Sequence, residues 1–429
     1  MPDGSATAHH YRPKLVTVMI EEGYGFRHFR KDMLAALTVA IVALPLSMAI
    51  AVASGVSPER GLYAAVIGGF LVSALGGSRY QIGGPAGAFI VLVAATVAKF
   101  GLEGLLLTVF ISGFMLTLIG LLRLGSLIRY IPHAVTIGFT SGIAVTIFAS
   151  QLRDLGGLNL STAEPGQLLP KLVVLGHALP TLNPAALAVG VGSAALIFLL
   201  RRLAPNWPGM LIAVVLASVA AWLFHLPVET IGSRFGQLPD GLPGPRLPDI
   251  SYATVLEVLP AALSFTLLGA VESLLSAKVA DGMTGRKHRY NMEVVAQGIA
   301  NIASALFGGI SVTGTIARTA TNIRAGAYSP VSGMAHALFV LVFMIVAAPL
   351  ASFVPLSALA GVLVVVCWNM AEKEEFARLL HDWRPAFVLI ATFGLTLIED
   401  LTVGIIAGCA LAAAFAIYDW AMGQQRANS

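Results

Sequence analysis

Residues 79–94 read RYQIGGPAGAFIVLVA and combine two opposing features. The second half is apolar enough for a lipid bilayer, whereas the first half carries two glycines and a proline, which interrupt a spanning helix. As a helix, 85–98 would reach only about 21 Å, which is short of the ~30 Å hydrocarbon core. If 79–84 are extended at about 3.3 Å per residue, they supply the missing distance. The stretch therefore predicts a half-helix that begins near the middle of a membrane.

A second stretch of the same kind is GGISVTGTIARTATN, residues 308–322. Gly308 and Gly309 precede a segment that we expect to be extended, and a short helix is predicted to begin near Gly314. In the first stretch we expect Pro85 at the first helical position, where its missing N–H costs nothing. Two half-helices with facing N-termini would form a cradle for an anion. The alternative is that the glycines only allow close helix packing.

The composition predicts a membrane protein with many spans. Of the 429 residues, 57% are hydrophobic and only 11% are charged, which is far from the balance of a soluble domain. The N-terminus lacks a cleavable signal pattern. Cys367 and Cys409 lie in apolar segments, and no ligand spacing predicts a metal site or a cofactor.

We expect fourteen apolar segments to cross the membrane: 33–53, 61–76, 85–98, 102–122, 133–151, 184–200, 208–225, 254–280, 291–308, 314–326, 330–350, 356–370, 385–398 and 401–422.

These segments divide into two series of seven that match in order and spacing. Each series has its short segment third, and each has an amphipathic stretch between its fifth and sixth spans, at 167–178 and 372–383. An odd number of spans per repeat inverts the second repeat. We therefore predict an all-α polytopic membrane protein with 14 transmembrane segments in a 7+7 inverted repeat, with half-helices as spans 3 and 10.

Charge placement sets the predicted orientation. With both termini in the cytoplasm, most of the 26 Lys and Arg residues fall on the cytoplasmic side, as the positive-inside rule requires. The pI near 9.1 reflects this bias, and because the basic residues form no aromatic-interleaved patch we expect no nucleic-acid binding. The sequence carries no HExxH motif, nucleophile elbow or paired carboxylates, so we expect no enzymatic activity.

Two ionisable residues lie deep within predicted spans, where each should face a cavity or a partner. Arg318 lies near the start of the second half-helix and adds positive charge to the two helix ends, which suits a dianion. Glu272 has two interpretations: a fixed ion pair with Arg318, or a desolvated carboxyl group that takes up a proton near neutral pH and couples proton entry to anion entry. Ser47, after Pro45, either hydrogen-bonds the substrate or bonds its own i−4 carbonyl.

Six stretches together carry a family resemblance: ALPLSMAIAVASGVSPERGLYAAVIGG (43–69), GGPAG (83–87), IGSRFGQLPDGLPGPRLPD (231–249), AVESLLSAKVADGMTG (270–285), AQGIANIASALFGG (296–309) and TIARTATNIRAGAYSPVSGMAHA (315–337). Over nearly its whole length the chain resembles the sulfate permease (SulP) family of anion transporters. The resemblance implies a single transmembrane domain over 1–429. Its core domain would cover about 33–122 plus 254–354, and its gate domain about 133–225 plus 356–422.

The resemblance also implies the site and its ligands. The substrate would lie between the starts of spans 3 and 10, and Glu272 would serve the coupling ion. The residues implied or expected to contact the anion are Ser47, Gly84, Pro85, Ala86, Gly87, Gly314, Thr315, Ile316, Ala317 and Arg318. Members usually carry a STAS domain after the last span; because the chain stops at Ser429, we expect none in it. A multi-pass position in a bacterial inner membrane and a homodimer are also expected.

The family moves sulfate, bicarbonate, chloride, oxalate and C4-dicarboxylates, and its bacterial members are mostly proton- or sodium-coupled symporters. The chain is similar overall to a bacterial member that moves fumarate with protons. Many members have Gln where Leu46 stands and Ser where Ala317 stands. Both changes remove hydrogen-bond donors, which disfavours a small, strongly hydrated anion such as sulfate. We therefore expect proton-coupled symport of a dicarboxylate such as fumarate.

Three alternatives stay open at this point. The first is a sulfate or bicarbonate symporter coupled to protons or sodium. The second is an uncoupled anion channel, against which Glu272 in the core argues. The third is a nucleobase permease, a class with the same architecture that carries an acidic residue where Arg318 stands here.

Overall fold

A computed structural model of the chain describes residues 11–125, 132–161, 164–165, 167–205, 207–399 and 401–427. The described residues are mostly helical, with one short two-stranded sheet among them. The elements of the first half are, in order, α2 (Lys14–Ile20), α3 (Phe26–Ala53), α4 (Pro58–Tyr63), the π-helix η1 (Ala64–Gly68), α5 (Gly69–Leu75), β1 (Gly83–Gly84), the 3-10 helix η2 (Gly87–Phe89), α6 (Ile90–Leu121), α7 (His133–Gly156), α8 (Leu168–Ala178), the 3-10 helix η4 (Leu179–Thr181), α9 (Pro184–Leu203), α10 (Gly209–Leu223) and α11 (Ile231–Phe235).

The second half follows a similar order of long and short helices. Its elements are α12 (Tyr252–Thr284), α13 (Tyr290–Leu306), β2 (Thr313–Gly314), α14 (Ile316–Arg324), α15 (Val331–Ala351), α16 (Leu356–Met370), α17 (Lys373–Leu379), α18 (Trp383–Ile398) and α19 (Leu401–Ala427).

Local sequence signals explain where several helices begin and end. Asn183 caps α9 through its side-chain oxygen, and Pro184 takes the first helical position. Ser251 caps α12 in the same way. At the other end, Gly157 after α7 and Gly285 after α12 have φ values of 57° and 71°. Only glycine adopts this left-handed conformation without strain, so each of these residues stops its helix.

The predicted apolar segments coincide with helices of the structure. Segments 85–98 and 102–122 are joined in α6, which bends at Gly101, where φ is 68° and ψ is −170°. Among the described residues, seven helices are long and apolar enough to cross a membrane, and four apolar helices are shorter. The chain is therefore a helical, multi-pass membrane protein. The count of 14 spans and the inverted repeat stay predictions.

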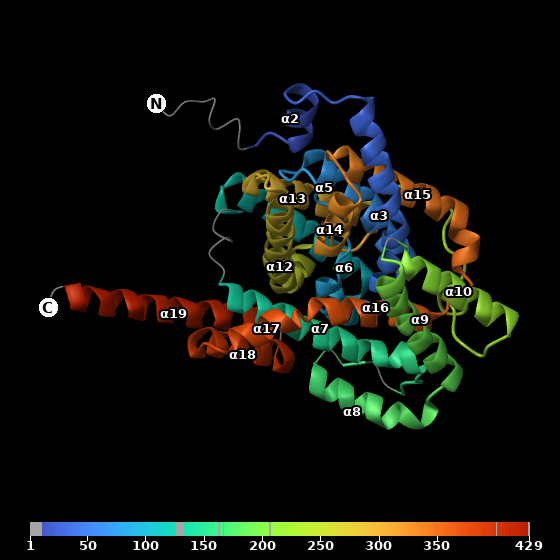
Figure 1. The fold of residues 1–429 in the computed structure, drawn as a ribbon. Coiled ribbons are helices and arrows are strands. Elements are labelled where there is room, and N and C mark those ends of the chain that lie inside the picture. The colour runs from blue at the N-terminus through green and yellow to red at the C-terminus, as the bar shows by residue number, and fades with distance from the viewer. Residues whose placement is uncertain are drawn as a thin grey trace.

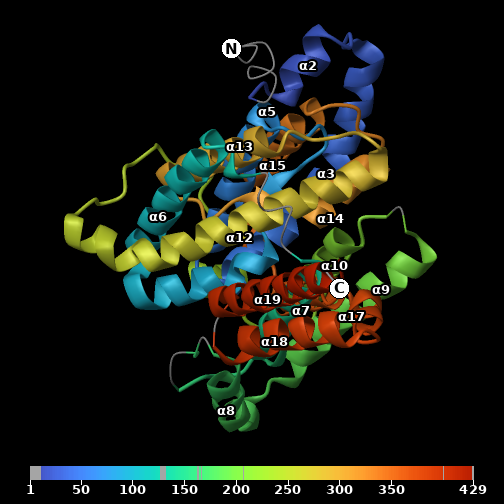
Figure 2. The same cartoon turned by 90° about the vertical axis from the view of Figure 1, so that its left-hand side faces the viewer.

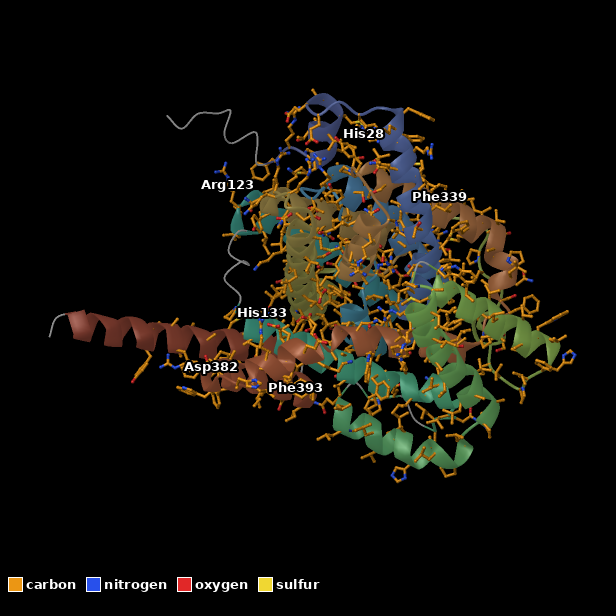
Figure 3. The ribbon with its side chains drawn as sticks, in the orientation of Figure 1. His28, Arg123, His133, Phe339, Asp382 and Phe393 are labelled. Carbon is orange, nitrogen blue, oxygen red and sulfur yellow. The ribbon has the colours of Figure 1, made fainter. Side chains whose placement is uncertain are left out.

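The described helices pack in two groups that lie one above the other in Figure 1 and remain separate after a quarter turn (Figure 2). In the upper group, α6 packs against α12 and α13, and α15 packs against α3 and α5. In the lower group, α7 packs against α16 and α18, and α16 also packs against α9. Figure 3 places His28 and Arg123 in the upper group and His133, Asp382 and Phe393 in the lower group. Contacts of α3 with α10 and α16 join the two groups.

Small residues let the upper helices approach closely. A Cβ added at Gly113 of α6 would lie 2.7 Å from the carbonyl oxygen of Gly298 in α13, and one added at Gly298 would lie 2.5 Å from the backbone nitrogen of Thr117. The two backbones are therefore nearly in contact, as is usual for helix pairs in membranes. This rigid pair supports the two extended segments described next.

The two-stranded sheet joins the two Gly-rich stretches. β1 and β2 are antiparallel, with Gly83 opposite Gly314 and Gly84 opposite Thr313. Asn301 of α13 fixes β2, because its side chain accepts from Val312 N at 2.9 Å and donates to Val312 O at 2.7 Å. This pairing brings together residues that lie about 230 positions apart in the chain.

Both half-helices begin later than the sequence analysis predicts. Pro85 does not take the first helical position: Ala86 is still extended, with φ −118° and ψ 144°, and the helix starts at Gly87. Likewise α14 begins at Ile316 rather than near Gly314. The physical reason is the strand pairing, which keeps both stretches extended until they have passed each other.

Candidate functional site

Arg318 is the central side chain where the two half-helices meet. It lies on the first turn of α14 and is only 1% exposed. Its Nη2 donates to Ser47 Oγ at 3.0 Å and to Pro85 O at 3.4 Å. Its Nε and Nη1 are buried without a hydrogen-bond partner among the described residues. A buried guanidinium with unused N–H groups is costly unless an acceptor occupies the space beside it.

Ser47 of α3 holds Arg318 by a hydrogen bond. Pro45 lies inside this helix, and Ser47 Oγ donates to Ala43 O at 2.7 Å while it accepts from Arg318. The expected i−4 bond is therefore present, and the same hydroxyl also orients the guanidinium. Direct contact of Ser47 with a substrate stays a prediction, because the side chain is fully buried.

Gly84 allows the arginine to lie against the backbone of the first stretch. Its φ is 156°, and a Cβ added there would lie 2.4 Å from Arg318 Nη1. Gly314 is packed just as closely, because a Cβ there would lie 1.8 Å from Gln81 Nε2. Gly87 differs: a Cβ there meets Met370 Sδ of α16 at 3.4 Å, an ordinary contact with the lower group of helices.

The starts of η2 and α14 have free N–H groups. The first N–H groups of any helix lack an acceptor within the helix, and neither Ala86 nor Thr315 caps them with its side chain. Ala317 is exposed, and Thr315 and Ile316 are partly exposed, so this helix start can be reached from outside the protein. Two helix ends and one guanidinium thus converge, which is an arrangement that favours an anion.

Residues of α12 hold the first extended stretch and the half-helix α14. Ser273 Oγ accepts from Gln81 Nε2 at 2.9 Å, and Ser276 Oγ donates to Thr319 Oγ1 at 3.2 Å. Glu272 lies on the same helix, directly before Ser273. Among the described residues, Arg318 bonds to Ser47 and Pro85 and not to Glu272, and the Glu272 carboxylate makes no hydrogen bond. Of the two interpretations of Glu272, the fixed ion pair is thus wrong in this conformation.

Glu272 is 7% exposed, and the charge of one carboxylate of the other helix group acts on it. Glu372, in the link between α16 and α17, acts on it electrostatically. Like charges on two separate helix groups repel each other, and this repulsion disappears when either carboxylate takes up a proton.

Sequence reasoning missed three polar residues around Arg318. Gln81 and Asn322 fix the extended first stretch, because Asn322 Nδ2 donates to Tyr80 O at 2.9 Å. His336 of α15 is fully buried, and neither of its ring nitrogens has a partner in the described structure. An ionisable residue inside an apolar run such as 331–351 is itself a signal of a site, and this signal was available in the sequence.

The fold and the site together define a class: membrane transporters that hold a solute where two helices are interrupted. Within this class the chain belongs to the sulfate permease family, because the model of that family matches residues 29–392. The sequence is 44% identical over 398 residues to the Bacillus subtilis protein YvdB, covering 92% of this chain and 75% of that protein. It is 32% identical over 393 residues to the bicarbonate transporter BicA of Picosynechococcus, covering 89% of this chain and 69% of BicA.

Solved structures show the same fold. The transmembrane domain of a cyanobacterium bicarbonate transporter BicA matches with a TM-score of 0.80 and 30% identity, covering 90% of this chain and 98% of that one. The murine anion transporter Slc26a9 in its inward-facing state matches with a TM-score of 0.87 at 19% identity, covering 98% of this chain and 73% of that one. At this identity the second match concerns the fold alone.

Proposed function

We propose that this chain moves small anions across the membrane together with protons, and that a dicarboxylate such as fumarate is the preferred substrate. The observation that carries the proposal is the buried Arg318, whose Nε and Nη1 lack an acceptor in the described structure. A carboxylate held between the starts of η2 and α14 would provide that acceptor. It would also accept from the free N–H groups of both helix ends.

The lining of the site supports a carboxylate over a strongly hydrated anion. Leu46, next to Ser47 on α3, is buried and apolar, and Ala317 at the start of α14 has no donor. An anion that sheds a complete hydration shell needs many donors in return, and these two positions offer none. The remaining proposed contacts come from the backbone and small side chains: Gly84, Pro85, Ala86, Gly87, Gly314, Thr315 and Ile316.

Proton coupling is proposed for Glu272. Protonation of this carboxyl would remove its repulsion with Glu372 on the other helix group. In the proposed cycle, the upper group acts as the core domain and the lower group as the gate domain. Proton uptake then lets the loaded core approach the gate, and proton release on the other side reverses the step.

Transport into proteoliposomes tests this proposal. An imposed inward proton gradient should drive accumulation of labelled fumarate, while a sodium gradient at equal pH should not. Accumulation that follows the sodium gradient would mean that sodium, and not a proton, is the coupling ion. Flux that never exceeds equilibrium would indicate a channel. Uptake of sulfate in place of fumarate would overturn the proposed substrate.

Bicarbonate is the second candidate substrate, and the likeness to BicA favours it. Bicarbonate carries one charge, so it would fill the site beside Arg318 and leave part of the positive potential unused. A direct competition assay decides between the two: unlabelled bicarbonate and unlabelled fumarate are compared as inhibitors of labelled fumarate uptake. Stronger inhibition by bicarbonate would make it the better substrate.

We also infer an inner-membrane position with both termini in the cytoplasm, a 7+7 arrangement of 14 spans, and a homodimer. Single cysteines introduced near Tyr11 and near Arg286 should react with an impermeant thiol reagent only in inverted vesicles. Light scattering of the purified protein measures the oligomeric state, and a monomer mass would contradict the dimer.

A further inference from the structure

A polar cavity lies in the upper helix group, away from Arg318. It has a volume of about 240 Å³ and lies where α2, the segment before β1 and the end of α12 meet. We call it the α2–α12 pocket. Its lining residues are Lys14, Glu22, Ser78, Arg79, Tyr80, Asp281, Arg286, Lys287 and His288.

The pocket has an excess of positive charge. Four of its lining residues are Lys or Arg and two are carboxylates, which leaves two positive charges with His288 neutral. Glu22 is shared by two of the cations, because it pairs with Arg79 and, at 3.4 Å, with Arg286. One carboxylate thus neutralises only half of the charge it contacts.

Two other cations have no carboxylate partner. Lys14 and Lys287 make no ion pair with any described residue, although both line the pocket. Burial, together with the charges of Arg289 and Arg79, lowers the pKa of the Lys14 amine. A cation in such surroundings is stabilised when an anion binds beside it.

His288 provides the strongest sign of a missing ligand. Its side chain is only 1% exposed, and its Nδ1 lies 2.7 Å from Asp281 Oδ2. Its Nε2 is buried without a partner among the described residues. Asp281 fixes the ring, so the second nitrogen is held in place at the pocket wall with its hydrogen-bonding capacity unused.

The size and chemistry of the pocket fit a phosphate group. Its volume is below the roughly 300–1,000 Å³ of sites for drug-sized ligands, but it is ample for a small oxyanion. A hydrogen phosphate has up to two negative charges and several acceptor oxygens, which match the two excess positive charges and the unpaired lysine ammonium groups, and its hydroxyl can donate to His288 Nε2. A carboxylate would use fewer of these donors.

We propose that the α2–α12 pocket binds a phosphate group, supplied either by free phosphate or by the headgroup of a membrane phospholipid. Ser78, Arg79 and Tyr80 continue directly into Gln81 and β1, so a bound phosphate would hold the segment that leads to Arg318. The site would thereby regulate the mobility of the first stretch. This proposal does not rest on the proposed substrate.

Isothermal titration calorimetry with inorganic phosphate tests the free-anion source. Four proteins are compared: wild type, Lys14→Gln/Lys287→Gln, Lys31→Gln and Arg318→Ala. Lys31 is an exposed lysine of α3 that does not line the pocket, so it is the matched control. The double variant should lose at least about tenfold in affinity, or about 1.4 kcal/mol, while the other two keep the wild-type value. Lys287→Gln alone, at an exposed position where substitutions usually change stability little, should show part of this loss.

Native mass spectrometry tests the lipid source. The wild type and the double variant are released from membranes of phosphatidylcholine with phosphatidic acid, and the retained lipid is counted. Selective retention of phosphatidic acid by the wild type alone would identify the lipid headgroup as the source of the phosphate group. Phosphate binding without lipid retention would identify free phosphate as the source. The proposal is overturned if neither probe binds, or if binding is lost in Arg318→Ala and kept in the double variant.

Discussion

Gly84→Ala is the change that tests the anion site most directly. The added Cβ would lie 2.4 Å from Arg318 Nη1 and 3.4 Å from Arg318 Cζ. Atoms in contact need about 3.4 Å or more, so the guanidinium must retreat by about 1 Å. It cannot do so freely, because the side chain is buried and its Nη2 is bound to Ser47 and Pro85. The variant therefore keeps the positive charge and forces it to shift by about 1 Å.

The expected loss follows from the charge on the ligand. At an effective dielectric of about 20, two unit charges attract by about 4.2 kcal/mol at 4 Å and by about 3.3 kcal/mol at 5 Å. Each ligand charge beside Arg318 thus loses about 0.8 kcal/mol, which is roughly fourfold in affinity for a monoanion. A dianion loses about 1.7 kcal/mol, or roughly 16-fold.

Equilibrium titration of the purified protein with fumarate and with formate measures both losses. The ratio of the two affinities is the informative quantity, because the backbone strain of alanine at a φ of 156°, about 1–3 kcal/mol, is common to both ligands and cancels. Gly87→Ala is the matched control: it adds the same methyl group further along the same stretch, at the start of the half-helix, and that methyl meets Met370 Sδ at an ordinary 3.4 Å.

Two outcomes would refute this reasoning. Equal losses for fumarate and formate would mean that Arg318 does not act on the ligand by its charge. A loss in Gly87→Ala as large as in Gly84→Ala would mean that added bulk, rather than displacement of the guanidinium, weakens binding. A normal melting temperature in both variants is needed for either comparison.

Three further changes address the other parts of the site. Ser47→Ala removes an acceptor of Arg318 and should lower the free energy of unfolding by about 1–3 kcal/mol in chemical denaturation. Ser54→Ala removes only an i−4 hydrogen bond, so it should cost clearly less. Equal costs in the two variants would contradict the role of Ser47. Glu272→Gln should end proton-driven accumulation in proteoliposomes while the melting temperature stays unchanged, because no ion pair is broken; a loss of about 3–5 kcal/mol of stability would instead reveal a buried partner. Gly87→Leu should abolish fumarate binding in calorimetry, because the leucine side chain would extend from the helix start toward α7 and α16. The protein should still elute as a single peak. Undiminished binding would place the ligand elsewhere.

The sequence alone was sufficient to predict the apolar helical segments and the presence of two half-helices. Segment 356–370 is the same helix in the structure, and 184–200 differs from α9 by three residues at one end. Such segments are predictable because the length and apolarity of a span are local properties that the bilayer imposes. Gly84 and Arg318 were also identified locally, one as a helix breaker within an apolar run and the other as a charge inside a span.

The partners of these residues were decided only by the tertiary structure. Pairing of β1 with β2 moved both helix starts to Gly87 and Ile316, and no local signal gives the register of two strands so far apart. The sequence left open an ion pair between Arg318 and Glu272, whereas in the structure Arg318 bonds to Ser47 and Glu272 is subject to the charge of Glu372. The local sequence determines which secondary structure a segment can form, because the interactions that favour a helix or a break involve residues that are close in the chain. Contacts between distant segments depend on how all the helices pack, so they were fixed only when the chain folded.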